Sequence, residues 1–178
     1  VYADQKEANL PRGTFDEVVG LILREIEGVR NELVVDWRAE NLEEKSGRIT
    51  RGAALALKSR VLLYAASPQF NPSGEKSKWA AAAAAAFEVI NMGIYSLHPD
   101  YGGLFVAETS TTSPETIWAV RMGATNEFER KNYPIGTQGG GTGICPSQNL
   151  VEAYESTGED TGDAYAGLDP RFYATVLR

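Results

Sequence analysis

The sequence predicts a mainly α-helical fold with long irregular loops and a few short strands. Three segments within residues 14–93 carry apolar residues at helical spacing, and one of them contains an unbroken run of alanines. After residue 93 this periodicity is lost and glycine becomes frequent. We therefore expect a helical scaffold over about residues 14–93 and a loop-rich segment with short strands over about residues 94–178.

The first helix is predicted to begin directly after Thr14. Thr14 and Glu17 have the spacing of a capping box, in which each residue caps the backbone of the other. The following apolar residues recur at steps of three and four, so they share one helical face that we expect to be buried: Phe15, Val18, Val19, Ile22, Ile26 and Val29. Residues 31–47 are rich in polar residues, which predicts a loop around Trp37.

A second helix is expected from about Arg51 to Ala66. Pro68 and Pro72 end it, because proline lacks a backbone donor and disfavours helix in the residue before it. Its expected apolar stripe consists of Ala54, Leu57, Val61 and Tyr64, with Leu55, Leu62 and Ala66 beside it.

A third helix is expected from about Ser77 to Met92. Ser77 is the expected N-cap, and Gly93 follows the helix where a left-handed residue is favoured. Residues 80–86 are all alanine, whose small side chain allows a close approach to a neighbouring helix. Because alanine buries little area, we expect the larger apolar residues to anchor this helix: Trp79, Phe87, Val89 and Ile90.

The remaining chain carries shorter signals. Residues 117–121 are bulky and apolar enough for a strand, and residues 122–145 are glycine-rich and predict a long loop. Ser147 is positioned to cap a short helix through Leu150, Val151 and Tyr154. Residues 169–178 read as a turn that leads into a strand.

Composition excludes several functional classes. The net charge of −7 opposes binding to a phosphate backbone, so nucleic acid is not an expected partner. No apolar run has the roughly 18 residues that a membrane-spanning helix needs. A single histidine, His98, and a single cysteine, Cys145, make most zinc sites and histidine-based triads hard to build. We expect no metal and no cofactor.

Three patterns with possible chemistry have simpler interpretations. The glycine cluster at residues 136–143 lacks the Gly-Lys-Ser/Thr ending of a phosphate-binding loop, so a structural role is favoured. Cys145 has no evident base, which favours an inert thiol over a nucleophile. The acidic pairs Glu43–Glu44 and Glu159–Asp160 are typical of solvated surface. The chain is therefore expected not to be an enzyme and to have no catalytic residue.

Aromatic residues within the polar part of the long loop are the best ligand-binding candidates. Sugars present flat C–H faces that stack on aromatic rings, while polar side chains take their hydroxyl groups. On this reasoning we select Asn126, Phe128, Arg130 and Tyr133. The alternative is that these rings only hold the loop in place.

Several motifs also occur in the order found in one known family. Residues 47–68, from Gly47-Arg48-Ile49 to Ala66-Ser67-Pro68, resemble the signature helix of the SusD/RagB family of Bacteroidetes surface lipoproteins, which bind glycans. Trp79 with the alanine run resembles the next helix of that family. Further matches follow in order: Met92–Leu97, Leu104–Phe105, Pro114–Ala119, Pro146–Glu155 and Asp169–Val176.

The resemblance implies a fold, a location and partners. It implies tetratricopeptide-like helix pairs forming an α-α superhelix, and no enzymatic activity. It implies capture of an oligosaccharide or polysaccharide at the outer-membrane cell surface, and hand-over to a SusC-like TonB-dependent transporter. Because members are longer, residues 1–178 are expected to be part of one such domain, truncated at both ends. The membrane-anchoring N-terminal lipid is expected to lie outside this sequence.

Two other interpretations stay open. In the first, a helical-repeat scaffold binds a peptide, a glycoprotein or the transporter itself through its paired helices. In the second, the chain is an enzyme that uses Cys145 or a carboxylate, and this is the least favoured. The sugar-binding loops of the SusD/RagB family are variable, so its ligand contacts are not transferred to this chain.

Overall fold

The computed structural model describes residues 11–37, 47–106, 112–120, 125–156, 158 and 162–176. These residues are mainly helical, as the sequence predicts. The chain divides into two compact units, Val1–Ser96 and Leu97–Arg178, which are described separately.

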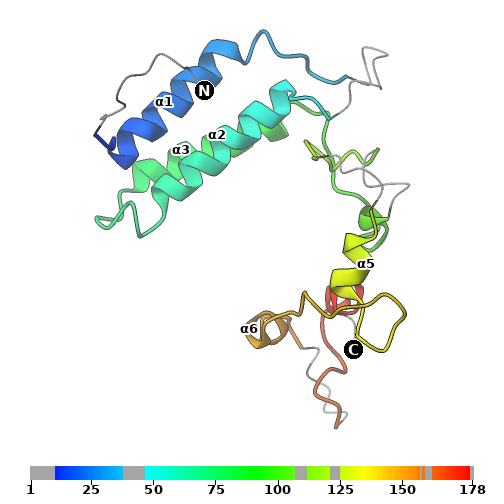
Figure 1. The fold of residues 1–178 in the computed structure, drawn as a ribbon. Coiled ribbons are helices and arrows are strands. Elements are labelled where there is room, and N and C mark those ends of the chain that lie inside the picture. Colours follow the sequence, from blue (N-terminus) through cyan, green and yellow to red (C-terminus); the bar gives the residue numbers. More distant parts are fainter. Residues whose placement is uncertain are drawn as a thin grey trace. The chain divides into compact units, whose positions relative to one another are not determined.

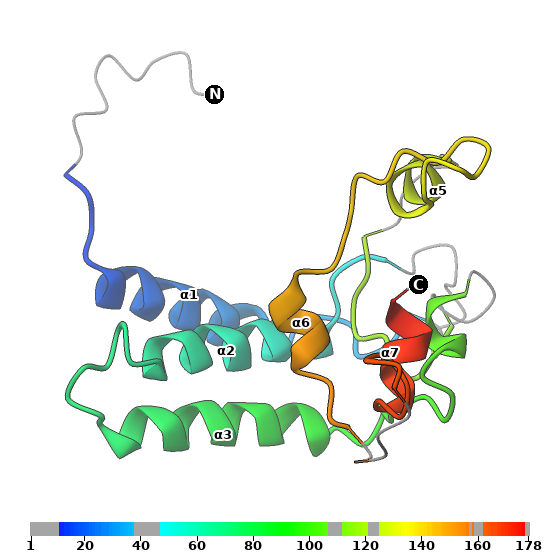
Figure 2. The ribbon, with the colours of Figure 1, turned by 90° about the horizontal axis from the view of Figure 1, so that it is seen from below.

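The first unit contains three helices, α1 (Phe15–Val29), α2 (Arg51–Ala66) and α3 (Lys76–Ile90) (Figure 1). Helix α2 packs against α1 and, over most of its length, against α3 (Figures 1 and 2). The short connection between α2 and α3 makes them a helical hairpin. The three predicted helices are thereby confirmed, with ends shifted by one or two residues in α3.

The helix ends follow the predicted signals with one exception. The capping box of α1 is confirmed: Thr14 Oγ1 accepts from Glu17 N–H at 3.2 Å, and Glu17 Oε2 accepts from Thr14 N–H at 2.8 Å. Gly93 adopts the expected left-handed conformation with φ of 67°. The prediction that Ser77 is the N-cap of α3 was wrong, because α3 begins at Lys76. The buried Asn71 holds this end instead, since its Oδ1 accepts from Glu75 N–H at 2.9 Å.

The hairpin interface is built from small residues, and three of the four predicted anchors of α3 are exposed, while the fourth, Val89, is half-buried. Ala82 and Ala85 are the buried residues of α3, whereas Trp79, Phe87 and Ile90 are exposed. An interface in which alanine faces a neighbouring helix leaves no space for an indole or phenyl group. The buried positions of α2 are of the same small kind, Leu55 excepted: Gly52, Ala54, Leu55, Ala65 and Ala66.

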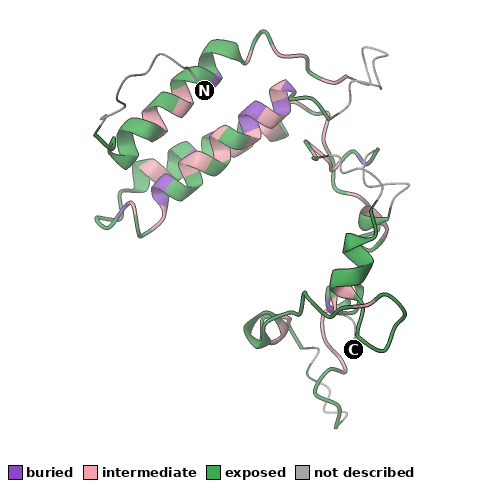
Figure 3. Cartoon of the chain, viewed as in Figure 1, coloured by how far each residue is buried: buried purple, intermediate pink, exposed green. Residues whose placement is uncertain are grey.

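The predicted apolar faces of α1 and α2 are buried only in part (Figure 3). On α1, Ile26 is buried, while Phe15 lies at the exposed start of the helix and stacks on Phe70 with ring centroids 3.8 Å apart. On α2, Leu57 and Tyr64 of the predicted stripe are exposed. The periodicity identified the helices correctly, but the buried side of α2 follows the small residues.

The second unit contains short helices: η2 (Gly103–Phe105), α5 (Glu127–Asn132), α6 (Gln148–Glu152) and α7 (Pro170–Thr175). The Ser147 cap is confirmed, because Ser147 Oγ accepts from Leu150 N–H at 3.3 Å. Within residues 112–120 the structure contains no strand, so the strand predicted for residues 117–121 was wrong over its described part.

The strand predicted near the end of the chain was also wrong, because residues 170–175 form α7. Asp169 caps this helix by accepting from Arg171 N–H at 2.8 Å, and Pro170 occupies the first turn, where its fixed φ suits a helix. The same Asp169 carboxylate binds the Arg171 guanidinium, and this lowers the pKa of Asp169 to about 2. These local signals outweigh the strand propensity of the aromatic and β-branched residues.

Phe172 of α7 is the centre of the small core of the second unit. Its side chain is 1% exposed and is surrounded by the rings of Tyr154, Tyr165 and Tyr173. The Tyr173 hydroxyl donates to the Tyr165 carbonyl oxygen at 2.9 Å and accepts from Leu168 N–H at 3.2 Å. The aromatic cluster thus fixes α7 against the chain that leads into it.

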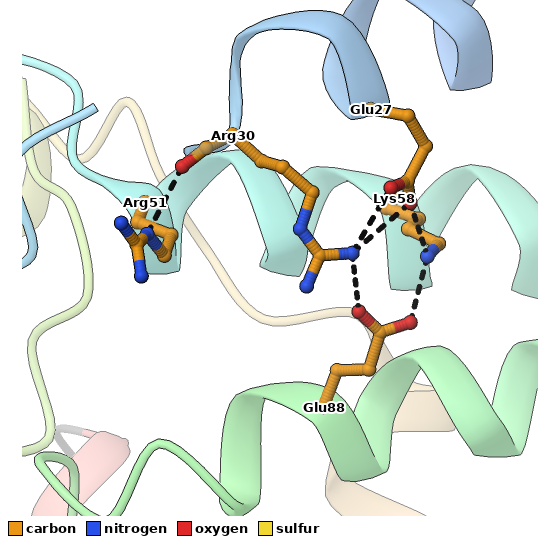
Figure 4. A network of polar contacts seen from close by, with 5 residues as sticks. All are labelled: Glu27, Arg30, Arg51, Lys58 and Glu88. Carbon is orange, nitrogen blue, oxygen red and sulfur yellow. Dashed lines mark hydrogen bonds and ion pairs between the residues drawn. The ribbon is translucent and has the colours of Figure 1, made fainter. Parts of the chain in front are cut away.

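An ion-pair network joins all three helices of the first unit (Figure 4). Lys58 of α2 lies 2.6 Å from Glu27 of α1 and 2.6 Å from Glu88 of α3. Arg30, which ends α1, binds the same two carboxylates at 3.1 and 2.8 Å. Arg51 Nε donates to the Arg30 carbonyl oxygen at 3.0 Å, which ties the start of α2 to the end of α1.

The network shifts the titration of its acidic members. The hydrogen bond from Lys58, aided by Arg30, lowers the pKa of both Glu27 and Glu88 below their ordinary value of 4.5. In an unfolded chain the same carboxyls take up protons at higher pH, so their contribution to stability is present above pH 4.5 and is lost as the pH falls through the folded pKa.

We predict that Glu88→Gln lowers the free energy of unfolding of the helical unit at neutral pH by about 1–2 kcal/mol, because Lys58 and Arg30 each lose a charged partner. The difference in unfolding free energy between the variant and the parent protein should shrink on acidification, because Glu88 of the parent then becomes protonated and loses its charge. Denaturant unfolding followed by circular dichroism at several pH values measures this. Glu25→Gln, at an exposed position of α1, is the matched control. A loss of unfolding free energy in Glu88→Gln that does not depend on pH would contradict the prediction.

Candidate functional site

The second unit contains a cleft of about 970 Å³. One part of the lining comes from α5 and the two residues that follow it: Phe128, Asn132, Tyr133 and Pro134. A second part comes from the end of α7 and the residue after it, 173–176, and the rest comes from residues 142, 144–147 and 150. Every part of this lining belongs to the same unit.

The glycine-rich segment forms its wall by folding back onto the end of α5. Thr142 N–H donates to the Tyr133 carbonyl oxygen at 3.0 Å, and the N–H groups of Gly143 and Ile144 donate to the Lys131 carbonyl oxygen at 2.8 Å. These bonds pair backbone carbonyls that the end of a helix otherwise leaves without partners.

Two glycines are required for this close approach. A Cβ atom on Gly140 would collide with the Pro134 carbonyl oxygen and would lie 2.8 Å from that of Tyr133. A Cβ atom on Gly141 would lie 2.9 Å from the Arg130 carbonyl oxygen. The glycine cluster therefore has the structural role that the sequence favours.

Thr142 occupies a strained backbone conformation at the cleft wall. Its φ is 46°, in the left-handed region that a β-branched residue rarely adopts, at a cost of roughly 1–3 kcal/mol. Its Oγ1 accepts from Ile135 N–H at 2.9 Å, which helps to hold this conformation. In this conformation Thr142 is part of the lining of the cleft.

The structure brings two of the four selected binding residues to the cleft. Phe128 and Tyr133 line it, whereas Asn126 and Arg130 are not among its lining residues. The reason is that residues 127–132 form α5, although the sequence predicts an irregular loop there. On a helix, positions 128 and 130 point roughly 200° apart, so Phe128 and Arg130 cannot share a face.

Sequence reasoning left out the other polar residues of the lining. They are uncharged and come from every wall of the cleft: Asn132, Thr142, Ser147, Tyr173 and Thr175. Asn132 lies four positions after Phe128, so recognising α5 as a helix would have placed both on one face. The others depend on how distant segments fold together, and no local pattern indicates that.

Of the remaining candidates from the sequence, one lies at the cleft. Cys145 is exposed and lines the cleft. His98 lies in an irregular segment, where its Nδ1 is 2.7 Å from the Asp100 carbonyl oxygen. The acidic pairs Glu43–Glu44 and Glu159–Asp160 lie outside the described residues. Among the residues that the structure describes, no cluster of three metal-ligating side chains occurs, and no helix is long and apolar enough to cross a membrane.

Comparison with protein-family models, with curated proteins and with solved structures gives no match. The proposed function is therefore based on the residues that line the cleft.

We predict that Gly140→Ala disrupts the cleft wall, because the new methyl group collides with the end of α5. The amide protons of Gly143 and Ile144 should then exchange faster with solvent, since their bonds to Lys131 are lost. Hydrogen exchange measured by mass spectrometry or NMR tests this. Gly136→Ala is the matched control, because a Cβ atom there meets nothing within 4 Å. Equal exchange in the two variants would show that the close approach does not hold the wall.

Proposed function

We propose that this protein captures an oligosaccharide in the cleft of its second unit without chemically changing it. The observation that carries the proposal is the lining, which combines aromatic rings with uncharged polar groups. Phe128 is 70% exposed, so its ring offers an open face to a ligand. Tyr133 and Tyr173 add two further rings that are partly exposed. Sugars present apolar C–H faces and hydroxyl groups, which match both parts of such a lining.

The absence of catalysis is part of the proposal. Hydrolysis of a glycosidic bond generally needs two carboxyl groups at a defined separation, and none of the described lining residues is Asp or Glu. Cys145 is the strongest nucleophile among them, but in the described part of the lining no histidine or carboxylate is present to take up its proton.

We further propose that the protein belongs to the SusD/RagB type and acts at the outer-membrane surface with a SusC-like TonB-dependent transporter. The ordered motifs in the sequence support this assignment. The α2–α3 hairpin, with its small buried residues, is compatible with one pair of a tetratricopeptide-like superhelix. In this proposal the helical unit is the scaffold and the second unit holds the ligand.

A second candidate function is supported by one feature of the helical unit. Trp79, Phe87 and Ile90 lie on the same side of α3 and are 45%, 59% and 66% exposed. Exposed apolar groups in such a row are typical of a surface that contacts another protein. This favours a scaffold that binds a peptide, a glycoprotein or the transporter, and such binding is compatible with glycan capture elsewhere in the chain.

We predict that Phe128→Ala and Tyr133→Ala each weaken oligosaccharide binding about tenfold, which corresponds to the ~1.4 kcal/mol of one aromatic stacking contact. Isothermal titration calorimetry of the parent and variant proteins against a panel of oligosaccharides measures the effect.

Arg130→Ala is the matched control, because Arg130 lies on the same helix but does not line the cleft. Its affinity should equal that of the parent protein. Full affinity in both aromatic variants would overturn the assignment of the cleft as the binding site. Release of shorter sugars during the titration would overturn the non-catalytic part of the proposal.

A further inference from the structure

We propose that the cleft selects uncharged glycans and discriminates against acidic ones such as uronic-acid or sulfated oligosaccharides. This inference rests on the proposed function and specifies its ligand class. It is carried by the lack of charge among the described lining residues, by the ion pairs of Lys131 and Arg171 on α5 and α7, and by the hydrogen-bonding capacity of the polar lining residues.

Among the residues that the structure describes, the lining contains no Asp, Glu, Lys, Arg or His. A carboxylate or sulfate that enters such a cleft loses part of its hydration and meets no cation in return. Transfer of an unpaired charge out of water is far more costly than transfer of a hydroxyl group that finds a hydrogen-bond partner. The transfer of a neutral sugar into the cleft therefore costs little free energy, while the transfer of an acidic sugar of the same size costs much more.

Two of the three cations on α5 and α7, Lys131 and Arg171, have anionic partners, and the third, Arg130, is not part of the lining and lies roughly 200° from Phe128 around α5. On α5, Lys131 Nζ lies 3.2 Å from Glu127 Oε2. On α7, the Arg171 guanidinium binds both oxygens of the Asp169 carboxylate. A ligand carboxylate would have to compete with these protein carboxylates, and the chain as a whole carries a net charge of −7.

The polar lining residues suit hydroxyl groups, which both donate and accept. Thr142 Oγ1 and Ser147 Oγ each accept from a backbone N–H, so each hydroxyl hydrogen is available for donation to a ligand. Thr175 Oγ1 donates to the Arg171 carbonyl oxygen at 2.8 Å, which leaves its oxygen able to accept. Asn132 Nδ2 donates to the Phe128 carbonyl oxygen at 2.7 Å, so the side-chain carbonyl of Asn132 adds a further acceptor.

The test compares one glycan in three forms: a neutral oligosaccharide that binds, its derivative oxidised to the carboxylate at C6, and that derivative after reduction of the carboxylate back to the alcohol. We expect the oxidised form to bind at least about tenfold more weakly, and the reduced form to regain the affinity of the original. Calorimetry on the whole chain gives the three affinities. In Ile144→Lys, which adds a cation to the lining, the oxidised form should regain affinity relative to the neutral one.

The outcomes separate this inference from the proposed function. Equal or tighter binding of the oxidised form by the parent protein overturns the selection for uncharged glycans and leaves glycan capture intact. An unchanged preference in Ile144→Lys also overturns it, because selection would then not arise from the charge of the lining. Failure of every neutral and acidic glycan to bind overturns the proposed function, and the inference with it.

Discussion

The cleft depends on one constraint, the direct contact of the glycine-rich backbone with the end of α5. Four consecutive residues take part: Gly140 and Gly141 have no space for a side chain, and the N–H groups of Thr142 and Gly143 pair carbonyl oxygens of the helix end. Within this contact Thr142 has a left-handed conformation and is part of the lining. The contact also binds the Tyr133 carbonyl oxygen, and Tyr133 lines the cleft together with Phe128.

The sequence was most informative where local signals agree with one another. Thr14 and Glu17 predicted the start of α1, Gly93 predicted the left-handed residue after α3, and Ser147 predicted the cap of α6. Each of these signals acts over three or four residues, so no distant contact can easily override it. At the other end of the chain, the Asp169–Pro170 pair carried a helix-start signal that the strand propensity of residues 172–176 concealed.

The sequence was least informative about which helix faces and which segments pack against one another. Trp79 and Phe87 are the larger apolar side chains of α3, but alanines occupy its buried side, because close helix packing excludes bulky groups. In the same way, periodic spacing could not reveal that Lys58 bridges carboxylates on two other helices. At the candidate site, Phe128 and Tyr133 were found from their loop chemistry, whereas Ser147 and Thr175 come from segments that meet only in the folded unit.

Occupation of the cleft by an oligosaccharide can be measured through a residue of the cleft itself. Cys145 is the single cysteine of the sequence, and its exposed side chain lines the cleft. The most direct measurement is the rate of alkylation of Cys145 with and without a saturating oligosaccharide that binds by calorimetry. Occupation of the cleft predicts that alkylation slows in proportion to bound ligand. An unchanged rate at full saturation would show that the sugar binds elsewhere.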